Sequence, residues 1–362
     1  MVGTKKDPGL YVHPTLLVDA TLGIPIGWGD IQIFKRNPEN KTKLERKYQT
    51  LPFEDKESRF WRDAIQNTSS AIPDVILTFV ADRESDIFEV WEAFDARRTH
   101  GIIRASRDRK TPDGNRLYKQ LSQGQVLGCV TLEVKADPRK KRLARTAKLE
   151  IRVEQMKIQR PKSHAKTLEA KEIVLYGVEV RELNCPVGQN PILWRLLTTH
   201  TVQTLEDAQK IVFYYSQRWL IERVFHVLKG GVLNVEAVQL EQGLSFEKLL
   251  VFGLAASIPI LLLIEARDGL VQVAGDVVLN AGELDCLSVV GKGLEGKTKA
   301  QQNPHVKRSL AWVSWVIARL GGWKGYVSER PAGTKTMSLG LRRFYDLYQG
   351  WSLLRVQDVC KP

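Results

Sequence analysis

Four side chains that can grip phosphate and hold a metal ion follow one another at short intervals in this sequence. Tyr215 is followed by Arg218, Glu222 and Lys229, at steps of three, four and seven residues. On one continuous helix these steps place all four side chains on the same face. The phenol, guanidinium and ammonium groups can bind phosphate oxygens beside a carboxylate that can hold a divalent cation. The alternative is a solvated charged face with an Arg218–Glu222 ion pair, which explains one spacing but not the whole set.

A second carboxylate stands at the end of an apolar run. Residues 75–81 (VILTFVA) predict a buried strand that ends at Asp82, and apolar residues then follow at helical spacing over about 84–97. Open α/β sheets place their chemistry at the carboxyl ends of strands. The alternative is that Asp82 serves only as the N-cap of the following helix. Taken with the first pattern, this position makes Asp82 and Glu222 the predicted metal-binding carboxylates.

The two patterns together resemble those of the IS4-type (Tn5-like) DDE transposases. That family carries a Y-R-E-K signature and a catalytic Asp at a strand end before Arg-Glu, as Asp82 stands here. The resemblance runs from about residue 10 to 351, which is nearly the whole chain. It implies that Asp82 and Glu222 are two of the catalytic acids Asp, Asp and Glu. It also implies that Tyr215, Arg218 and Lys229 hold DNA phosphates near the cleaved end.

Three further segments match the family. Arg104 follows a short apolar strand, at the offset where the family has a DNA-contacting arginine. Trp194 opens a strand over residues 194–199 and resembles the family's platform for a base turned out of the duplex, where stacking contributes ~1–3 kcal/mol. Residues 309–312 and 317–322 look like the family's helical dimerisation region. The resemblance therefore implies a homodimer formed through C-terminal helices.

The N-terminus departs from the family pattern. The first catalytic Asp of the family lies on a strand upstream of the one that residues 11–18 resemble, and this chain begins at Met1. Asp7 precedes a proline in a turn-like start, and Asp19 follows an apolar run in the register of the second strand. Asp19 is therefore only a weak substitute for the missing ligand. We expect an N-terminally truncated transposase without the first Asp and without the end-recognition domain.

The resemblance implies cut-and-paste DNA transposition. In the family, water attacks at the transposon end, and the freed 3′ hydroxyl then attacks the opposite strand to form a hairpin and later attacks target DNA. Two Mg²⁺ ions (or Mn²⁺) about 4 Å apart serve such phosphoryl transfer. With two of the three acids, we expect this chain alone not to cleave DNA. The alternative is a non-catalytic truncated transposase, acting as a dimerising inhibitor or persisting as a decaying remnant.

Composition favours a polyanionic partner. The 362 residues include 54 Lys and Arg against 41 Asp and Glu, a formal net charge of +13. Basic residues cluster over 104–110, 138–148 and 157–171, and we expect each cluster to lie in a loop. The expected partner is double-stranded DNA, both transposon ends and target, bound through charge with a steep salt dependence. A basic solvated surface is the alternative on composition alone.

The sequence favours a protein of the bacterial cytoplasm, associated with the nucleoid. Its four cysteines contain no C-x-x-C pair, so neither a zinc site nor a disulfide framework is expected. The first residues do not resemble a signal peptide. Residues 249–264 are apolar, but they fall short of the ~20 needed to span a bilayer and include Pro259. We therefore expect a buried helix there and no membrane partner.

Pattern changes along the chain give the predicted order of elements. Strands are expected near 10–20 and 24–34 with a hairpin turn at 23–27, then a loop over 35–53 and a helix over about 55–70. Residues 104–200 alternate mostly as strands, a helix over about 205–229 carries Glu222, and the remainder is mainly helical.

This order predicts an α/β fold: an RNase H-like (DDE transposase) core with a β-rich insertion and a helical C-terminal region. The predicted domains are a partial core over 1–104, the insertion over 105–200, the end of the catalytic core over 201–235 and the dimerisation region over 236–362. The insertion explains why 222 − 82 = 140 residues separate the two acids.

Overall fold

The chain divides into two compact units. The computed structural model describes residues 10–35, 53–95, 97–134, 136, 142–161, 169–230, 234–238, 240, 243–326 and 329–359. The first unit, here the sheet unit, holds the described residues up to 15 and from 29 to 218. The second, the helical unit, holds residues 16–28 and the described residues from 219 onward. The boundary at residues 218 and 219 therefore falls inside the Tyr215–Lys229 pattern.

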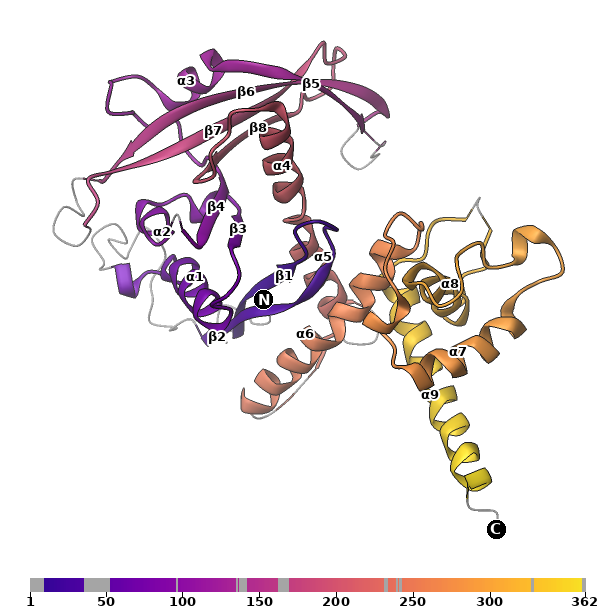
Figure 1. Cartoon of the computed structure of the whole chain (residues 1–362). Coiled ribbons are helices and arrows are strands. Elements are labelled where there is room, and N and C mark those ends of the chain that lie inside the picture. Colours follow the sequence, from indigo (N-terminus) through magenta and orange to yellow (C-terminus); the bar gives the residue numbers. More distant parts are fainter. Residues whose placement is uncertain are drawn as a thin grey trace. The chain divides into compact units, whose positions relative to one another are not determined.

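A six-stranded mixed sheet forms the centre of the sheet unit (Figure 1). Its first two strands, β3 (Leu77–Ala81) and β4 (Thr99–Arg104), run parallel. All other neighbours pair antiparallel. The four strands that follow β4 across the sheet are, in spatial order, β8 (Leu193–Thr198), β7 (Glu172–Leu183), β6 (Arg145–Gln159) and β5 (Gln125–Val134). The prediction of a mixed α/β fold is confirmed, and the strands of residues 105–200 join the same sheet as β3 through the β4–β8 pair.

Helix α4 (Leu205–Ser216) covers one face of this sheet. It begins with a capping box, in which Thr204 and Asp207 satisfy each other's backbone N–H groups. Its side chains at positions 208, 211 and 215 pack on buried residues of the central strands, among them Ile151, Val178, Val180 and Leu196. These strand residues alternate with polar ones, as a half-covered strand requires.

Three short helices cover part of the opposite face: α1 (Arg59–Ala71), α2 (Phe88–Glu92) and α3 (Leu117–Gln123). Leu121 of α3 packs against Met156 and Ile158 of β6. The approach is so close that a Cβ added at Gly177 would lie 2.2 Å from a methyl carbon of Leu121. Strand β6 therefore buries odd positions under α4 up to Val153 and even positions under α3 from Met156 onward.

The segment after β3 is less helical than predicted. A helix was expected over about 84–97, whereas residues 83–85 form a 3₁₀ turn, η3, and α2 spans only Phe88–Glu92. The carboxylate of Asp82 accepts the backbone N–H of Glu84, and the carboxylate of Asp86 accepts the backbone N–H of Ser106, which follows β4. These two hydrogen bonds hold the backbone of residues 82–86 out of a regular helix.

The N-terminal hairpin forms a separate two-stranded sheet of β1 (Leu10–Val18) and β2 (Pro25–Lys35). Its turn lies at residues 19–24, so the prediction of a turn at 23–27 was wrong. Oδ1 of Asp19 accepts the backbone N–H groups of Thr21 and Leu22 at 2.8 and 2.7 Å, and Gly23 adopts a left-handed φ of 69°. Most of the loop predicted over 35–53 lies outside the described residues.

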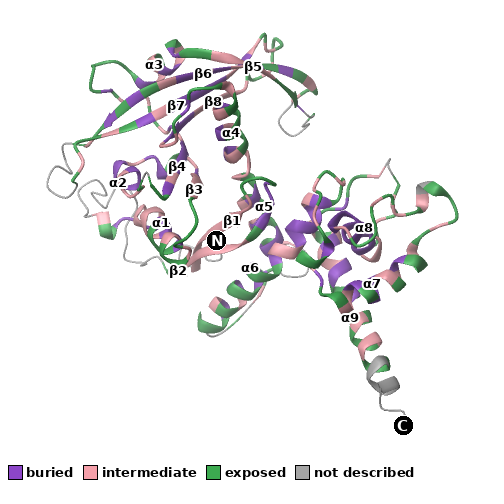
Figure 2. Cartoon of the chain, viewed as in Figure 1, coloured by how far each residue is buried: buried purple, intermediate pink, exposed green. Residues whose placement is uncertain are grey.

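The helical unit confirms the prediction that the remainder of the chain is mainly helical. It contains α5 (Trp219–Lys229), α6 (Gly243–Ala266), α7 (Ala281–Leu294), α8 (Leu310–Leu320) and α9 (Thr334–Val359). Helix α8 is buried over nine consecutive residues and forms the core of this unit (Figure 2). Short 3₁₀ turns occur at Gly275–Val277 and Lys299–Gln301.

Helix α6 is longer than the apolar stretch from which it was predicted. Its length and composition are those of a membrane-crossing helix, but core helices share both, and 56% of its most apolar window is buried inside the protein. Leu254, Leu261 and Leu263 are fully buried, whereas Leu244 and Phe252 near its start are exposed. The predicted buried helix is thus confirmed for its second half.

The basic clusters are only partly loops. Residues 145–148 and 157–159 belong to β6, so the prediction of a loop was wrong for these parts of the second and third clusters. A strand with alternate burial tolerates such residues because every second side chain can point to solvent. Residues 137–141 and 162–168 lie outside the described part of the chain.

A stacked histidine pair predicts a pH dependence of stability. His100 and His200 stack with ring centroids 4.0 Å apart, and Nε2 of His200 lies 2.9 Å from Oγ1 of Thr78. Burial, then the charges of His100 and Lys210, lower the pKa of His200 to about 4. The unfolded chain therefore binds more protons between the ordinary pKa of 6.5 and about 4. Stability is fully present above pH 6.5 and is lost as the pH falls toward 4.

Because His200 is partly exposed, we expect a loss of about 1–2 kcal/mol, less than the full shift would give. Urea unfolding of wild type and His200→Gln at neutral and mildly acidic pH measures it, with exposed His226→Gln as control. An unchanged pH dependence in His200→Gln would contradict this assignment.

Candidate active site

The carboxylate of Asp82 lies at the carboxyl end of β3, as predicted. Its backbone is extended, and its Oδ1 accepts the N–H of Glu84 at 2.9 Å. The hydroxyl of Ser85 donates to the Asp82 carbonyl oxygen at 2.8 Å. Within the described residues Oδ2 accepts no hydrogen bond. Asp82 is therefore both the N-cap of η3, as the alternative prediction had it, and a half-buried carboxylate with one oxygen available.

The strand register brings Arg104 and Trp194 to the same edge. In the parallel pair Ala81 lies opposite Ile103, so Asp82 and Arg104 are the next residues on two neighbouring strands. Arg104 donates to the carbonyl oxygen of Leu193 at 3.4 Å, at the start of β8. The carboxyl ends of β3 and β4 and the beginning of β8 thus meet at one end of the strands. This end, here called the strand-end edge, carries Asp82, Arg104 and Trp194.

Trp194 and Tyr215 pack against each other on the face covered by α4. Their rings make an edge-to-face contact with centroids 5.7 Å apart and an interplanar angle of 66°. Tyr215 is only 4% exposed and belongs to the core, while Trp194 is half-buried. Tyr215 therefore supports the indole ring, a role that its predicted phosphate contact did not include.

The helix predicted over 205–229 is broken, and the single-face arrangement of the four side chains was wrong. Helix α4 ends at Ser216 and α5 begins at Trp219. Residues 217 and 218 make hydrogen bonds of the tighter i→i−3 type to the carbonyl oxygens of Tyr214 and Tyr215.

The reason lies in the buried stripes of the two helices. The buried spacing of α4, at 208, 211 and 215, would continue through Arg218 and Glu222, whereas α5 buries positions 220, 224, 227 and 228. A charged side chain is costly to bury, so the apolar stripe restarts in a new phase.

Glu222 and Lys229 therefore lie in the helical unit, seven residues apart on α5 and on one side of it. Both side chains are exposed, and Nζ of Lys229 lies 3.0 Å from a carboxylate oxygen of Glu236. Arg218 is half-buried at the boundary. Asp19, the weak substitute ligand, is committed through Oδ1 to its hairpin turn.

A buried carboxylate that was not predicted from the sequence holds this edge in place. Oδ2 of Asp86 accepts the backbone N–H and the hydroxyl of Ser106 at 2.8 and 3.0 Å, and Oδ1 accepts Trp91 Nε1 at 3.0 Å. Arg109 pairs with the same carboxylate and donates to the Asp86 carbonyl oxygen at 3.2 Å. Asp86 thus joins the segment after β3, which carries Asp82, to the segment after Arg104.

One residue of the hairpin, His13, lies within electrostatic reach of Asp82. Burial lowers the pKa of the His13 imidazole, while the nearby carboxylates of Asp30 and Asp82 raise it. Asp30 accepts hydrogen bonds from the side chains of Gln32 at 2.7 Å and Asn67 at 3.2 Å. His13 sits inside a strand without a motif around it, so only the fold shows that it lies within electrostatic reach of Asp82.

The donor chemistry fits a divalent cation. Carboxylate oxygens are the ligands that Mg²⁺ and Mn²⁺ take, with water and phosphate oxygens in the other positions. Asp82 offers a half-buried oxygen at the sheet edge, and Glu222 an exposed carboxylate on α5. Within the described residues no three His, Cys, Asp or Glu side chains already form a closed metal site. Each of the two carboxylates is of the kind that can bind a divalent cation together with water and phosphate oxygens.

Comparison with known protein families identifies the family of this chain. Residues 55–258 match the Transposase DDE domain family, which is more than half of the chain. The matched region runs from just before α1 into α6 and contains Asp82, Arg104, Trp194 and Glu222. The chain therefore belongs to the DDE transposase family.

Proposed function

We propose that this protein is a cut-and-paste transposase of the IS4 (Tn5-like) type, with an RNase H-like core and Asp82 and Glu222 as two of its metal-binding acids. The observation that carries the proposal is the meeting of Asp82, Arg104 and Trp194 at one strand-end edge within a DDE transposase domain. The parallel β3–β4 pair that ends at this acid supports the RNase H-like assignment.

Each of the proposed site residues has its own role in DNA strand cleavage. Asp82 and Glu222 would hold Mg²⁺ or Mn²⁺, which when bound supplies Lewis-acid stabilisation of charge on the reacting phosphate. Arg104, Arg218 and Lys229 bind phosphate oxygens and fix the scissile bond in place. Trp194 stacks a displaced base, and Tyr215 keeps the indole ring oriented through their edge-to-face contact.

A plasmid-nicking assay with Mg²⁺ and with Mn²⁺ tests this proposal. Metal-dependent nicking that disappears in Asp82→Asn supports it, because that change keeps the shape of the side chain and removes its charge. Nicking that persists unchanged in Asp82→Asn overturns the site. A wild type that binds DNA without nicking it favours the alternative of a non-catalytic DNA-binding protein.

We further propose that the protein forms a homodimer through α9. The residues resembling the family's dimerisation region form α8 and its C-terminal turn, and α8 is buried within one chain. Helix α9 instead buries Met337, Leu341 and Phe344 and leaves Leu347 and Leu354 exposed, seven residues apart on one face.

Sedimentation velocity tests the dimer. Leu347→Glu with Leu354→Glu is expected to shift the protein to a monomer, because two carboxylates would enter an apolar interface. Leu270→Glu, an exposed leucine elsewhere in the same unit, is expected to leave the dimer intact. A wild type that stays monomeric at high concentration would contradict the proposal.

A further inference from the structure

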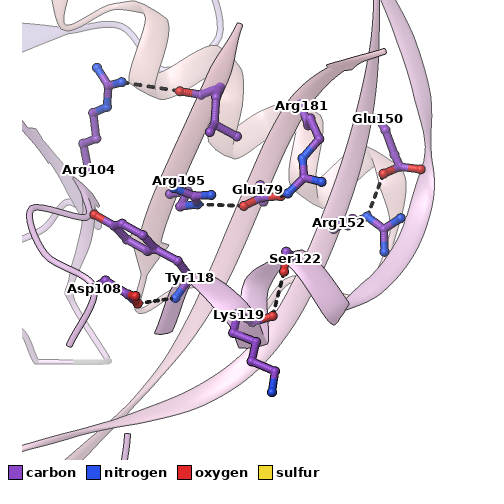
Figure 3. A network of polar contacts seen from close by, with 11 residues as sticks. Arg104, Asp108, Tyr118, Lys119, Ser122, Glu150, Arg152, Glu179, Arg181 and Arg195 are labelled. Atoms are coloured by element: carbon purple, nitrogen blue, oxygen red, sulfur yellow. Dashed lines mark hydrogen bonds and ion pairs between the residues drawn. The ribbon is translucent and has the colours of Figure 1, made fainter. Parts of the chain in front are cut away.

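One half of a sheet face is ionic, and α3 touches it only at its margin, where Tyr118 contacts Arg195 and the carbonyl oxygen of Gly124 accepts from Arg152. Toward one end of β6 and β7 the α3 side is apolar and covered, with Met156, Ile158 and Leu175 buried. Toward the other end the same side carries charged residues in two cross-strand rows. The first row is Arg152, Glu179 and Arg195, and the second contains Glu150 and Arg181 (Figure 3).

A buried glutamate sits at the centre of this ionic half-face. The side chain of Glu179 has no exposed surface, and its two oxygens bind different guanidinium groups: Arg181 at 2.6 Å and Arg195 at 2.7 Å. Arg152 is paired separately with Glu150 at 2.6 Å. One carboxylate between two guanidinium groups leaves this triad with a net positive charge.

The two arginines are held in place but have donors to spare. A guanidinium group has five N–H donors, and Arg195 uses its Nε on Glu179 while its plane lies 4.1 Å from the ring centroid of Tyr118. Tyr118 is fixed because its backbone N–H donates to Asp108 at 2.8 Å at the start of α3. Within the described residues the terminal nitrogens of Arg195 donate to no acceptor, and Arg181 donates only to Glu179.

We propose that Arg181 and Arg195 form a phosphate clamp for the DNA backbone, with Glu179 as the residue that positions both. A guanidinium fork matches the geometry of a phosphate group. The contacts with Glu179 and Tyr118 already order the arginine side chains, so phosphate binding costs less side-chain entropy. The clamp lies at the strand-end edge, because Arg195 directly follows Trp194 on β8 and points to the opposite face.

Charge complementarity identifies the occupant. The chain carries a formal charge of +13, and the ionic half-face has three arginines against two glutamates. Backbone contacts of this kind fix register on the duplex and carry no sequence information. The inference rests on the proposed function in one respect, the identity of the polyanion as DNA.

Fluorescence anisotropy with a labelled duplex of arbitrary sequence, over a series of NaCl concentrations, tests the clamp in the full chain. Arg181→Ala and Arg195→Ala are each expected to weaken binding about five- to twentyfold at low salt. Each should also reduce the slope of log affinity against log salt by about one phosphate contact. The control is Lys292→Ala, which removes one exposed charge from α7 of the helical unit, outside the three basic clusters, and should change neither quantity.

Glu179→Gln separates positioning from simple charge. This change raises the net charge by one, so an unpositioned basic surface would bind DNA more tightly. The clamp instead predicts weaker binding, because neither guanidinium keeps its ionic anchor. Tighter binding in Glu179→Gln would overturn the positioning role. Thermal unfolding followed by circular dichroism checks that each variant is folded. If Arg195→Ala does not fold, Arg195→Lys takes its place, because lysine keeps the positive charge and lacks only the guanidinium fork.

The outcomes separate this inference from the proposed function. A wild type that binds the duplex with a steep salt dependence, but arginine variants with unchanged slopes, would overturn the clamp and leave the proposed function standing. A wild type with no salt-dependent DNA affinity would overturn both.

Discussion

Glu222→Ala and Asp82→Ala are each expected to abolish high-affinity Mn²⁺ binding and to slow any metal-dependent DNA cleavage about a thousandfold or more. Each ion at a phosphoryl-transfer site contributes several kcal/mol to the transition state. Every 1.36 kcal/mol changes the rate about tenfold. Removing one carboxylate ligand therefore removes most of the contribution of its ion. Isothermal titration with Mn²⁺ measures binding directly, whether or not the chain cleaves DNA.

The matched controls are Glu84→Ala and Glu206→Ala, which remove exposed carboxylates close to Asp82 and on α4. Both should bind Mn²⁺ as wild type does. Equal losses in the controls would show a general effect of surface charge. Undiminished binding in Asp82→Ala or in Glu222→Ala would remove that residue from the proposed site.

Asp86→Ala is expected to lower the free energy of unfolding by about 3–5 kcal/mol. The side chain of Asp86 has no exposed surface, and its removal takes away the ionic partner of the half-buried Arg109 guanidinium. It also leaves the donors of Ser106 and Trp91 unsatisfied, each at a further cost. A loss of this size is a large part of the stability of a typical domain. Urea unfolding followed by tryptophan fluorescence measures it.

The control for Asp86→Ala is an exposed ion pair that also joins a carboxylate to an arginine. Glu54 binds the guanidinium of Arg62 through both oxygens but is exposed, so Glu54→Ala should change stability little. Asp86→Asn keeps one acceptor and the shape, and should fall between the two. A loss in Asp86→Ala no larger than that in Glu54→Ala would contradict the role of Asp86 in holding the edge.

The strand-end position of Asp82 could be predicted from sequence, because an apolar run such as VILTFVA followed by a polar residue is typical of a buried strand that ends there. Arg104 and Trp194 were found by resemblance, and the register then showed that they share an edge with Asp82. Local signals were sufficient for each strand separately, while their adjacency depended on the β4–β8 pair between residues distant in sequence.

The break between α4 and α5 shows how a motif can mislead. The steps of three, four and seven fit a helix, but the apolar positions of the same segment change phase after Tyr215. The change of phase was visible in the sequence and contradicted the single face. Asp86 and Glu179 could not be predicted, because a buried carboxylate requires partners such as Ser106 and Arg195 that only the folded chain supplies.

If Asp82 and Glu222 belong to the same metal centre, their carboxylates must bind one ion or two ions about 4 Å apart. Anomalous diffraction from crystals soaked with Mn²⁺ tests this most directly. We predict manganese peaks bonded to carboxylate oxygens of both Asp82 and Glu222, either one shared peak or two peaks about 4 Å apart. A peak bonded to neither, or carboxyl groups more than ~10 Å apart in the metal-bound crystal, would contradict the shared centre.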